Sequence, residues 1–408
     1  MRIEKPPHKY SPCLACRISY SMDYSEMCMG TYDVIIIGAG PGGSSAAYLL
    51  ASAGMRVALV DQARFPRDKL CGGMMSERTE KVYRSIFGDH WQNAHEFSSS
   101  GARFFYKGRL LNEVSDYRRI YFTTRTSLDY HLVQLACAKG AALLENARAM
   151  SLEPDRGIIR LSEGGSLRGD FVIGADGVVS TVARNLGFPA RKNKLATGLE
   201  IEFPRQGNLA DLSRPEIYFG IVRWGYGWIL PKKDTLTIGI AGLPQKNRGL
   251  KESFQAFLKQ VCSQVPDIQW RGHPIPFCNF TLRPGRGNAL LVGDAAGFVE
   301  PVTGEGIAFA MQSATHAAHA ILDAAHHGDP QCALRHYKNR YARLERLLTQ
   351  ATWMRYFVFS TLSEKVFLSA LQKSKSMIHR YMDLAADEMD YADYSRFLIK
   401  KLALHFLH

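Results

Sequence analysis

The chain has 408 residues, of which 46% are hydrophobic and 22% are charged, and its formal net charge is +13. This length can bury a large core, and this composition excludes disorder for most of the chain. The positive charge favours acidic partners, such as nucleic acid, an anionic membrane surface or a phosphate-bearing small molecule, without choosing among them.

No stretch approaches the roughly 18 consecutive apolar residues that a membrane-spanning helix needs. Residues 1–30 contain no continuous apolar run of the kind that forms a secretory signal. We therefore expect a cytoplasmic protein that does not cross a bilayer. Its eight cysteines are scattered through the chain, and we expect them to be mostly reduced.

Residues 1–30 show no helical or strand period, which predicts a flexible N-terminal extension. Cys13 and Cys16 have the spacing of half a zinc site, with His8 and Cys28 nearby. Known zinc patterns pair two half-sites, whereas Cys28 stands alone. We therefore favour a tail over a metal site.

The stretch TYDVIIIGAGPGGSSAAYLLASAGMRVALVDQ predicts a nucleotide-binding β-α-β unit. Residues 32–37 form a short apolar run rich in β-branched residues, which is typical of a strand buried on both faces. A helix of small residues follows and stops near Gly54. Residues 56–60 predict a second strand, which ends on Asp61.

Glycines between the first strand and the helix have GxGxxG spacing, at Gly38, Gly40 and Gly43, with Gly42 in the same loop. Gly38 allows the tight turn, Gly40 lets the backbone approach a pyrophosphate, and Gly43 lets helix and strand pack closely. The phosphates would lie on the helix N-terminus, and Asp61 would bind the ribose hydroxyls. The order of these parts favours a loop that binds a dinucleotide over a turn with only a structural role. Asp61 favours FAD or NAD as that dinucleotide over NADP.

Two later stretches join a buried strand to a glycine-rich turn. Residues 171–184, FVIGADGVVSTVAR, contain Asp176, and residues 287–314 run through Asp294 and Gly304 into a helix of small residues. In order and wording they resemble the second and third fingerprints of flavoprotein hydroxylases and their relatives, which share the p-hydroxybenzoate hydroxylase fold. We therefore include Asp176 and Gly304 among the expected FAD-binding residues.

This resemblance implies FAD rather than NAD as the cofactor. In that group the aspartate of the third fingerprint binds the FAD ribityl chain, which implies this role for Asp294. The next helix N-terminus faces the flavin pyrimidine, at Gly306 and Ile307, where its dipole stabilises the charge that develops on reduction. The group also has an arginine beside the pyrophosphate or ribityl chain, here Arg125, and a backbone contact to adenine near Ala149. A solvated surface charge is the alternative for Arg125.

Two further segments narrow the family: PRDKLCGG at residues 66–73 and YGWILP at residues 226–231. They resemble the PxxKxCGG loop and YxWxFP segment of the geranylgeranyl reductase family. Leu230 replaces the usual aromatic residue and Met74 with Met75 follows the glycine pair, which leaves the substrate open. Flavin halogenases carry a related WxWxIP segment but usually lack the CGG loop.

The family reduces isolated prenyl C=C bonds, which requires a proton for one carbon as hydride reaches the other. Gly72 and Gly73 would let their loop pass against the isoalloxazine, so Cys71 is our first catalytic candidate and part of the cofactor site. A spacer in a tight loop is the alternative for Cys71. Tyr226 is the second candidate for the proton donor.

Short strand-like runs separated by turn residues predict an antiparallel sheet between residues 191 and 284, roofing an apolar cavity over the flavin. Tyr226 and Trp228 would share one strand face and contact a polyisoprenoid chain, together with Pro231 and Met74. Aromatic residues also favour strands in general, so ordinary core packing is the alternative.

We predict an α/β protein with a Rossmann-like FAD-binding domain of the p-hydroxybenzoate hydroxylase type, interleaved with an antiparallel β-sheet substrate domain and followed by a C-terminal helical region. The FAD-binding domain would comprise residues 31–100, 125–190 and 285–330, the substrate domain 101–124 and 191–284, and the helical region 331–408.

Residues 331–408 contain 13 Lys and Arg residues and 7 Asp and Glu residues. Large apolar residues recur there at helical spacing among the basic ones: Leu344, Leu347, Leu348, Trp353 and Phe357. This pattern fits a basic amphipathic helix on an anionic membrane and equally a helix that caps the flavin domain.

The expected function is FAD-dependent reduction of C=C bonds in a polyprenyl lipid, a quinone side chain or a pigment precursor. The alternatives are an FAD-dependent monooxygenase or halogenase of the same fold, and a non-catalytic membrane- or nucleic-acid-binding protein. Without a second complete nucleotide-binding unit, the electron donor would be transiently bound NAD(P)H or a protein such as ferredoxin. We expect no nucleic-acid partner and a cytoplasmic location, with peripheral binding to the inner face of the membrane as a further option.

Overall fold

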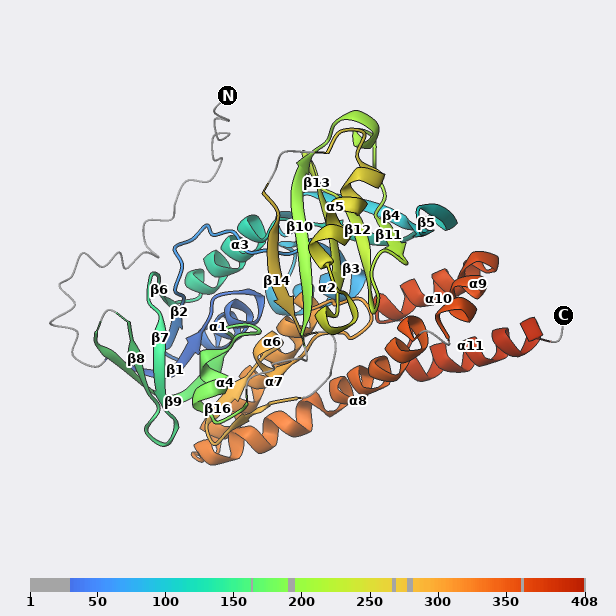
Figure 1. Ribbon diagram of the computed structural model, residues 1–408. Coiled ribbons are helices and arrows are strands. Elements are labelled where there is room, and N and C mark those ends of the chain that lie inside the picture. The colour runs from blue at the N-terminus through green and yellow to red at the C-terminus, as the bar shows by residue number, and fades with distance from the viewer. Residues whose placement is uncertain are drawn as a thin grey trace, which may run out of the picture.

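The computed structural model describes residues 30–162, 164–189, 195–265, 269–276, 282–360 and 363–406. The predicted N-terminal extension, with Cys13, Cys16 and Cys28, lies outside the described residues. The described chain forms two eight-stranded sheets with helices packed around them (Figure 1).

The first sheet contains the predicted nucleotide-binding unit. Its strand order is β15-β16-β9-β1-β2-β6, and the five strands from β16 to β6 are parallel. Their bounds are β1 Gly30–Ile37, β2 Val57–Val60, β6 Ala142–Leu144, β9 Ser166–Gly174, β15 Gly285–Arg286 and β16 Ala289–Leu291. The antiparallel strands β7 (Ala149–Glu153) and β8 (Ile158–Leu161) extend the sheet from β9.

Three helices pack closely against this sheet: α1 (Pro41–Ser52), α3 (Arg125–Ala138) and α7 (Ile307–His326). α1 contacts both α3 and α7, and its small side chains are mostly buried. Small residues allow this close approach, as the sequence predicts for a helix behind a glycine-rich loop. The other helices of this part are α2 (Glu77–Phe87), α4 (Thr181–Asn185) and α6 (Gly293–Ala296).

The second sheet has the order β14-β10-β13-β12-β11-β4-β5-β3. Its strands are β3 Met74–Ser76, β4 Phe97–Tyr106, β5 Arg109–Phe122, β10 Ala196–Pro204, β11 Glu216–Phe219, β12 Gly225–Pro231, β13 Thr235–Gly242 and β14 Arg271–Ile275. Neighbouring strands are antiparallel, as predicted, except that β11 pairs parallel with β4.

Strand alternation gives the second sheet two different faces. One face carries Ile229 and Ile238, which pack with Phe254 and Phe257 of α5 (Leu250–Val261). Residues one position away, such as Trp228, point to the opposite face. That opposite face is the one that meets the nucleotide-binding half of the molecule.

The predicted division of the chain ends its first FAD-binding segment at residue 100. In the structure, however, Met74–Ser76 pairs with β5, and β4 already begins at Phe97. Both segments therefore belong to the second sheet, because the loop before β3 leads the chain directly onto that sheet's edge. The division into domains otherwise stays a prediction.

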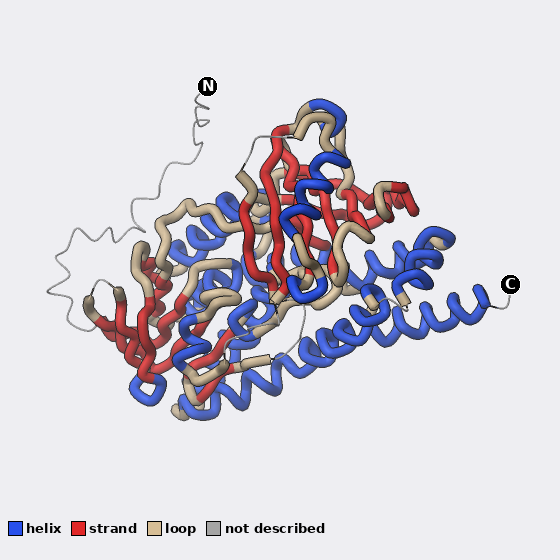
Figure 2. The backbone as a smooth tube through the Cα atoms, viewed as in Figure 1, coloured by secondary structure: helices blue, strands red, loops and turns tan. Residues whose placement is uncertain are grey.

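The C-terminal region is helical, as predicted, with α8 Ala333–Phe359, α9 Glu364–Lys373, α10 Lys375–Ala385 and α11 Tyr391–Phe406. These helices lie together along one side of the molecule, where α8 runs from α7 towards α9, α10 and α11 (Figure 2). Leu344 and Leu348 are buried, whereas Trp353 is 74% exposed, so the predicted apolar stripe is split between core and surface.

In the part of the chain that the structure describes, no helix has both the length and the apolar character needed to cross a membrane. Peripheral contact of the C-terminal helices with a membrane stays a prediction.

The short 3-10 helices are η3 Trp91–Asn93, η4 Pro154–Arg156, η5 Gly207–Leu209, η6 Pro244–Lys246 and η7 Pro330–Cys332.

Candidate active site

The glycine-rich loop is held by Asp61, the acid predicted at the end of the second strand. One carboxylate oxygen accepts the Ala39 amide at 2.8 Å, and the other accepts the Ala63 amide at 2.9 Å. Gly38 makes the turn with φ +99°, a conformation that favours glycine. Asp61 therefore fixes the loop, and its contact with the ribose hydroxyls stays a prediction.

A buried arginine cluster, Arg67, Asp129 and Arg125, lies beside this loop. Arg125 donates to both oxygens of Asp129, at 2.7 and 2.8 Å, and Nη1 of Arg67 lies 3.0 Å from Oδ2 of Asp129. The Asp129 side chain is fully buried and that of Arg125 is 7% exposed. Two guanidinium groups thus share the Asp129 carboxylate, and Nη2 of Arg67 also lies 3.8 Å from Oδ2 of Asp61.

The space at Gly40 tests whether a dinucleotide fits this loop. A Cβ atom at this position would lie 3.4 Å from Nη2 of Arg125 and 3.8 Å from Nη2 of Arg67. Gly40 is also the N-cap of α1, whose first backbone amides are free of intrahelical partners. A bare backbone, a helix N-terminus and two guanidinium groups surround one space, which suits a pyrophosphate.

The segment leading to Ala149 runs beside the same loop. The Ala147 amide donates to the Asp61 carbonyl at 3.0 Å, and the Asn146 amide donates to the Ala63 carbonyl at 3.3 Å. This neighbourhood agrees with the adenine contact expected near Ala149, which is itself buried in β7. The contact to adenine stays a prediction.

Asp176 has a local structural role in the described chain. Its carboxylate accepts hydrogen bonds from the Ser180 hydroxyl and from the Thr181 and Val182 amides, the amides at 2.6 and 3.1 Å. It therefore caps the N-terminus of α4. Burial raises the pKa of Asp176, and these hydrogen bonds oppose the rise. A direct contact between Asp176 and FAD stays a prediction.

One cavity of about 370 Å³ extends from the glycine-rich loop to the space between the second sheet and the C-terminal helices. Of the predicted site residues, it is lined by Gly40, Gly42, Cys71, Gly72, Gly73, Met74, Arg125, Tyr226, Trp228, Asp294, Gly304, Gly306 and Ile307. Six others do not line it: Gly38, Gly43, Asp61, Ala149, Asp176 and Pro231.

The CGG loop lies flat against β12 in this cavity. A Cβ on Gly72 would lie 2.7 Å from Cδ1 of Leu230 and 3.7 Å from Nε1 of Trp228. A Cβ on Gly73 would lie 1.9 Å from the Thr123 carbonyl oxygen. Gly73 is therefore required by close approach to backbone, whereas a side chain at Gly72 would displace the end of Leu230. The indole N–H of Trp228 is buried beside the loop, and it has no hydrogen-bond partner among the described residues, so it can donate to a ligand.

The third fingerprint brings its two predicted features together. Asp294 lies in the first turn of α6, and Gly306 is the N-cap of α7. A Cβ on Gly306 would lie 3.3 Å from Oδ1 of Asp294. An acceptor and a helix N-terminus thus lie next to each other on the cavity wall, a suitable arrangement for a ribityl chain and a flavin ring edge.

Tyr226 lies on the cavity wall, but its hydroxyl is occupied. The Tyr226 hydroxyl donates to the backbone carbonyl of Thr303. Burial also raises the pKa of Tyr226, with nearby Glu300 acting in the same direction. This geometry favours Tyr226 as a wall of the cavity rather than as a proton donor.

Among the residues of the candidate site that were not predicted are Asp129 of the arginine cluster and Glu200 of β10, which lines the cavity. Asp129 stands four residues after Arg125 in a predicted helix, a spacing that brings side chains together and would have identified it. Glu200 carries no comparable local signal, because its position depends on the register of the second sheet.

The far wall of the cavity comes from the C-terminal helices, which the sequence left as a cap or a membrane helix. Met354 and Val358 of α8, Phe367 of α9 and Met382 of α10 line it. The sequence prediction therefore missed one whole side of the substrate site, which distant segments of the chain provide by packing. For these inward-facing residues, the alternative of a helix that caps the flavin domain is the better description.

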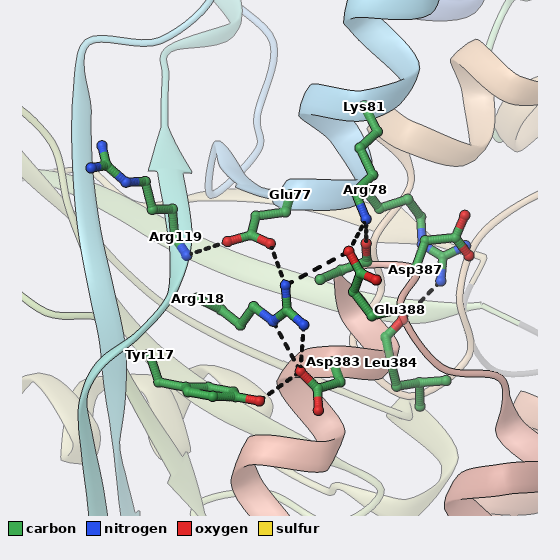
Figure 3. Close-up of polar contacts among 11 residues, drawn as sticks. Glu77, Arg78, Lys81, Tyr117, Arg118, Arg119, Asp383, Leu384, Asp387 and Glu388 are labelled. Atoms are coloured by element: carbon green, nitrogen blue, oxygen red, sulfur yellow. Dashed lines mark hydrogen bonds and ion pairs between the residues drawn. The ribbon is translucent and has the colours of Figure 1, made fainter.

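Polar contacts fasten α10 to α2 and β5 at the rim of the cavity (Figure 3). Arg118 donates to Oδ1 of Asp383 at 2.8 and 2.9 Å and lies 3.1 Å from Glu77. The hydroxyl of Tyr117 donates to the same Asp383 oxygen at 2.7 Å. Arg78, which is buried, donates to the carbonyl of Leu384 at 2.8 Å. These contacts hold the wall that α10 contributes.

Replacing Arg118 by methionine is expected to lower the free energy of unfolding by about 1–3 kcal/mol, because charged hydrogen bonds to Asp383 and Glu77 are lost. Arg119→Met is the matched control, since the Arg119 side chain points away from this network (Figure 3) and makes no ion pair within the described residues. Urea unfolding measures both variants, and limited proteolysis locates any loosening to α10. Equal losses in the two variants would contradict this role of Arg118.

A family model described as an FAD binding domain matches residues 31–206. A geranylgeranyl diphosphate reductase from Rhodobacter capsulatus is 30% identical over 312 residues, covering 73% of this chain and 77% of that protein. A menaquinone reductase from Mycolicibacterium smegmatis is 28% identical over 319 residues, covering 70% and 75%. The solved structure of a geranylgeranyl bacteriochlorophyll reductase-like protein from Thermoplasma acidophilum has a TM-score of 0.77 at 23% identity, and the match covers 92% of this chain and 100% of that one.

Proposed function

Since the chain belongs to the geranylgeranyl reductase family of FAD-dependent oxidoreductases, we propose that it saturates C=C bonds of a polyprenyl chain carried by a lipid or a quinone. One observation carries the proposal: the polar nucleotide loop and an apolar cavity wall enclose a single continuous space. Such a space would hold a hydride donor at one end and a hydrocarbon chain at the other.

At the polar end, the chain's own residues would hold FAD, which when bound and reduced supplies a hydride. The N-terminus of α1 with Arg67 and Arg125 would bind the pyrophosphate. Asp294 would accept from the ribityl hydroxyls, and the N-terminus of α7 would stabilise negative charge on the ring system. Trp228 supplies a buried N–H donor beside the CGG loop.

At the other end, the wall matches a branched hydrocarbon. Ile217 and Phe219 of β11, Val358 of α8 and Met382 of α10 contribute apolar side chains. An isolated alkene has no carbonyl that the protein can polarise, so the substrate would be held by dispersion and by exclusion of water. Two apolar walls on either side of one hydrocarbon chain would provide both the dispersion contacts and the exclusion of water.

The test is mass spectrometry of polyprenyl compounds after anaerobic incubation with chemically reduced, FAD-loaded protein. Geranylgeranyl diphosphate and a menaquinone are suitable probes, and each saturated bond adds two hydrogens to the mass of the chain. A reduced enzyme that leaves both probes unchanged, and instead consumes oxygen to hydroxylate or halogenate an aromatic compound, would refute the proposal.

Cys71→Ala is expected to keep FAD bound but to slow alkene reduction about tenfold, or ~1.4 kcal/mol of barrier, or to change which bond is reduced. The reason is that Cys71 lines the cavity in a loop that packs against β12. Flavin absorbance measures cofactor content, and mass spectrometry measures the products. The control is Cys262→Ala, because Cys262 is buried under α5 outside the cavity. Unchanged turnover and product in Cys71→Ala would return Cys71 to the role of a spacer.

A further inference from the structure

A buried glutamate, Glu200 of β10, lines the cavity beside the CGG loop. It is 5% exposed. Across the sheet it pairs with Gly239 of β13, which in turn pairs with Trp228 of β12. A Cβ on Gly239 would lie 2.4 Å from the indole ring, so the ring lies over this glycine. Glu200 and the Trp228 indole are therefore neighbours in one row of the cavity wall.

Glu200 differs from the neighbouring carboxyl group, Glu202, in its side-chain partners. Glu202 lies 3.0 Å from Nζ of Lys232 and accepts the hydroxyl of Thr237 at 2.9 Å. Within the described residues, no side chain donates a hydrogen bond to Glu200. A buried carboxyl without a counter-ion is more stable in its neutral form, which carries a proton that it can donate.

The charges around Glu200 come from each element packed on it. Lys232 and Glu202 lie on its own sheet, Arg271 of β14 pairs with it directly, and the Cys71 backbone approaches from the CGG loop. Burial raises the pKa of Glu200 to about 7, and Glu202 adds to the rise, against Lys232, Cys71 and Arg271. Two more basic groups, Lys69 and His273, line the same cavity, and burial lowers the pKa of each.

We propose that Glu200 is the proton donor of alkene reduction, a role that rests on the proposed function. Reduced FAD, when bound, would supply a hydride, which forms a C–H bond at one alkene carbon and brings the electron pair. The O–H bond of Glu200 breaks, and its proton forms the second C–H bond at the other carbon. The product has gained two hydrogens, FAD is oxidised, and the Glu200 carboxylate takes up a proton from water.

Other acids in the cavity are less suitable than Glu200. The Tyr226 hydroxyl is committed to the Thr303 carbonyl. Glu305 also lines the cavity, but one of its oxygens accepts the hydroxyls of Ser76 at 2.6 Å and Thr79 at 3.0 Å. Burial raises the pKa of Glu305 as well, but Arg78 and these two hydroxyl bonds oppose that rise, whereas no side-chain hydroxyl bonds Glu200 among the described residues.

The proton on Glu200 also predicts a pH dependence. The folded-state pKa of about 7 lies above the unfolded value near 4.5. The native state therefore keeps this proton between pH ~4.5 and ~7, and its contribution to stability is full below the lower value and is lost as the pH rises through the upper one. Alkene reduction should fall over the same upper range, because the donor is then ionised.

The experiment compares Glu200→Gln and Glu200→Asp with the control Glu96→Gln in FAD-loaded protein. Glu96 lies near the same Lys232 and desolvation raises its pKa too, yet its side chain is exposed and does not line the cavity. Infrared difference spectra without substrate follow the carbonyl stretch of protonated carboxyl groups from about pH 6 to pH 8. Rapid mixing of chemically reduced enzyme with geranylgeranyl diphosphate measures the rate of alkene reduction.

We expect Glu200→Gln to retain FAD, to lose one carboxyl signal that titrates near pH 7, and to reduce the alkene about 10²–10⁴-fold more slowly. Glu200→Asp should keep part of the rate, and Glu96→Gln should match the wild type. An unchanged rate in Glu200→Gln, or an unchanged infrared titration, would overturn the proton-donor role alone. A wild-type enzyme that reduces no probe would overturn the proposed function, whereas the infrared result would still report the proton on Glu200.

Discussion

Asp129→Ala is expected to lower the free energy of unfolding of the FAD-free protein by about 3–5 kcal/mol, the cost of leaving a buried charge without its partner. Arg125 is 7% exposed and makes two hydrogen bonds to Asp129. Arg67, at 3.0 Å from the same carboxylate, loses its nearer partner and keeps only Asp61, at 3.8 Å. Neither guanidinium can be neutralised, because arginine stays protonated in proteins.

Bound FAD should reduce this loss, since its pyrophosphate would supply negative charge at Gly40, where both guanidinium groups converge. Urea unfolding with and without FAD measures the difference. The control is Asp323→Ala, which removes a half-exposed ion pair to Arg340 and should cost no more than about 1 kcal/mol. An equal loss with and without FAD would place the arginine cluster away from the pyrophosphate.

The nucleotide-binding half of the molecule could be predicted because its signals are local in sequence. The strand expected at residues 32–37 is β1, Gly30–Ile37, and the one expected at 56–60 is β2, Val57–Val60. Strands buried on both faces require short continuous apolar runs, and a tight turn favours glycine, so neighbouring residues suffice for both inferences. Asp61 could be predicted for the same reason, because it directly follows the second strand of the β-α-β unit that begins before the glycine-rich loop.

The substrate half could be predicted only in outline, because its geometry depends on pairing between distant segments. The runs expected to form strands do form them, but the sequence does not give their register. The strand register pairs both Glu200 and Trp228 with Gly239, and this pairing places the two side chains side by side on the cavity face. The same holds for the Tyr226 hydroxyl, which meets the carbonyl of Thr303 in another part of the chain.

The C-terminal helices show a second limit. Helical spacing predicts that Leu344 and Trp353 both belong to an apolar stripe, yet only Leu344 is buried. Periodicity identifies an apolar face, but the neighbour that covers it is decided by tertiary packing. In this protein α8 lines the cavity with Met354 and Val358, which do not belong to the predicted stripe.

Two glycines of the nucleotide loop should respond to alanine in different ways. At Gly43 a Cβ atom would lie 1.8 Å from the carbonyl oxygen of Gly38, a backbone atom that cannot move without shifting β1 away from α1. Gly43→Ala is therefore expected to cost more than about 4 kcal/mol of unfolding free energy, a size reserved for severe steric damage. Its unfolding transition should drop sharply whether or not FAD is added.

Gly40→Ala should instead keep the fold and lose the cofactor. The residue has φ −78°, which any amino acid adopts, and its Cβ would approach only side-chain guanidinium groups, Arg125 at 3.4 Å and Arg67 at 3.8 Å. The added methyl group would occupy the space that suits the pyrophosphate, so we expect FAD affinity to fall at least about tenfold with little change in the FAD-free unfolding curve. Flavin fluorescence titration and urea unfolding of both variants separate the two effects. Equal damage to the fold in Gly40→Ala and Gly43→Ala would mean that Gly40 supports the loop and does not shape a phosphate site.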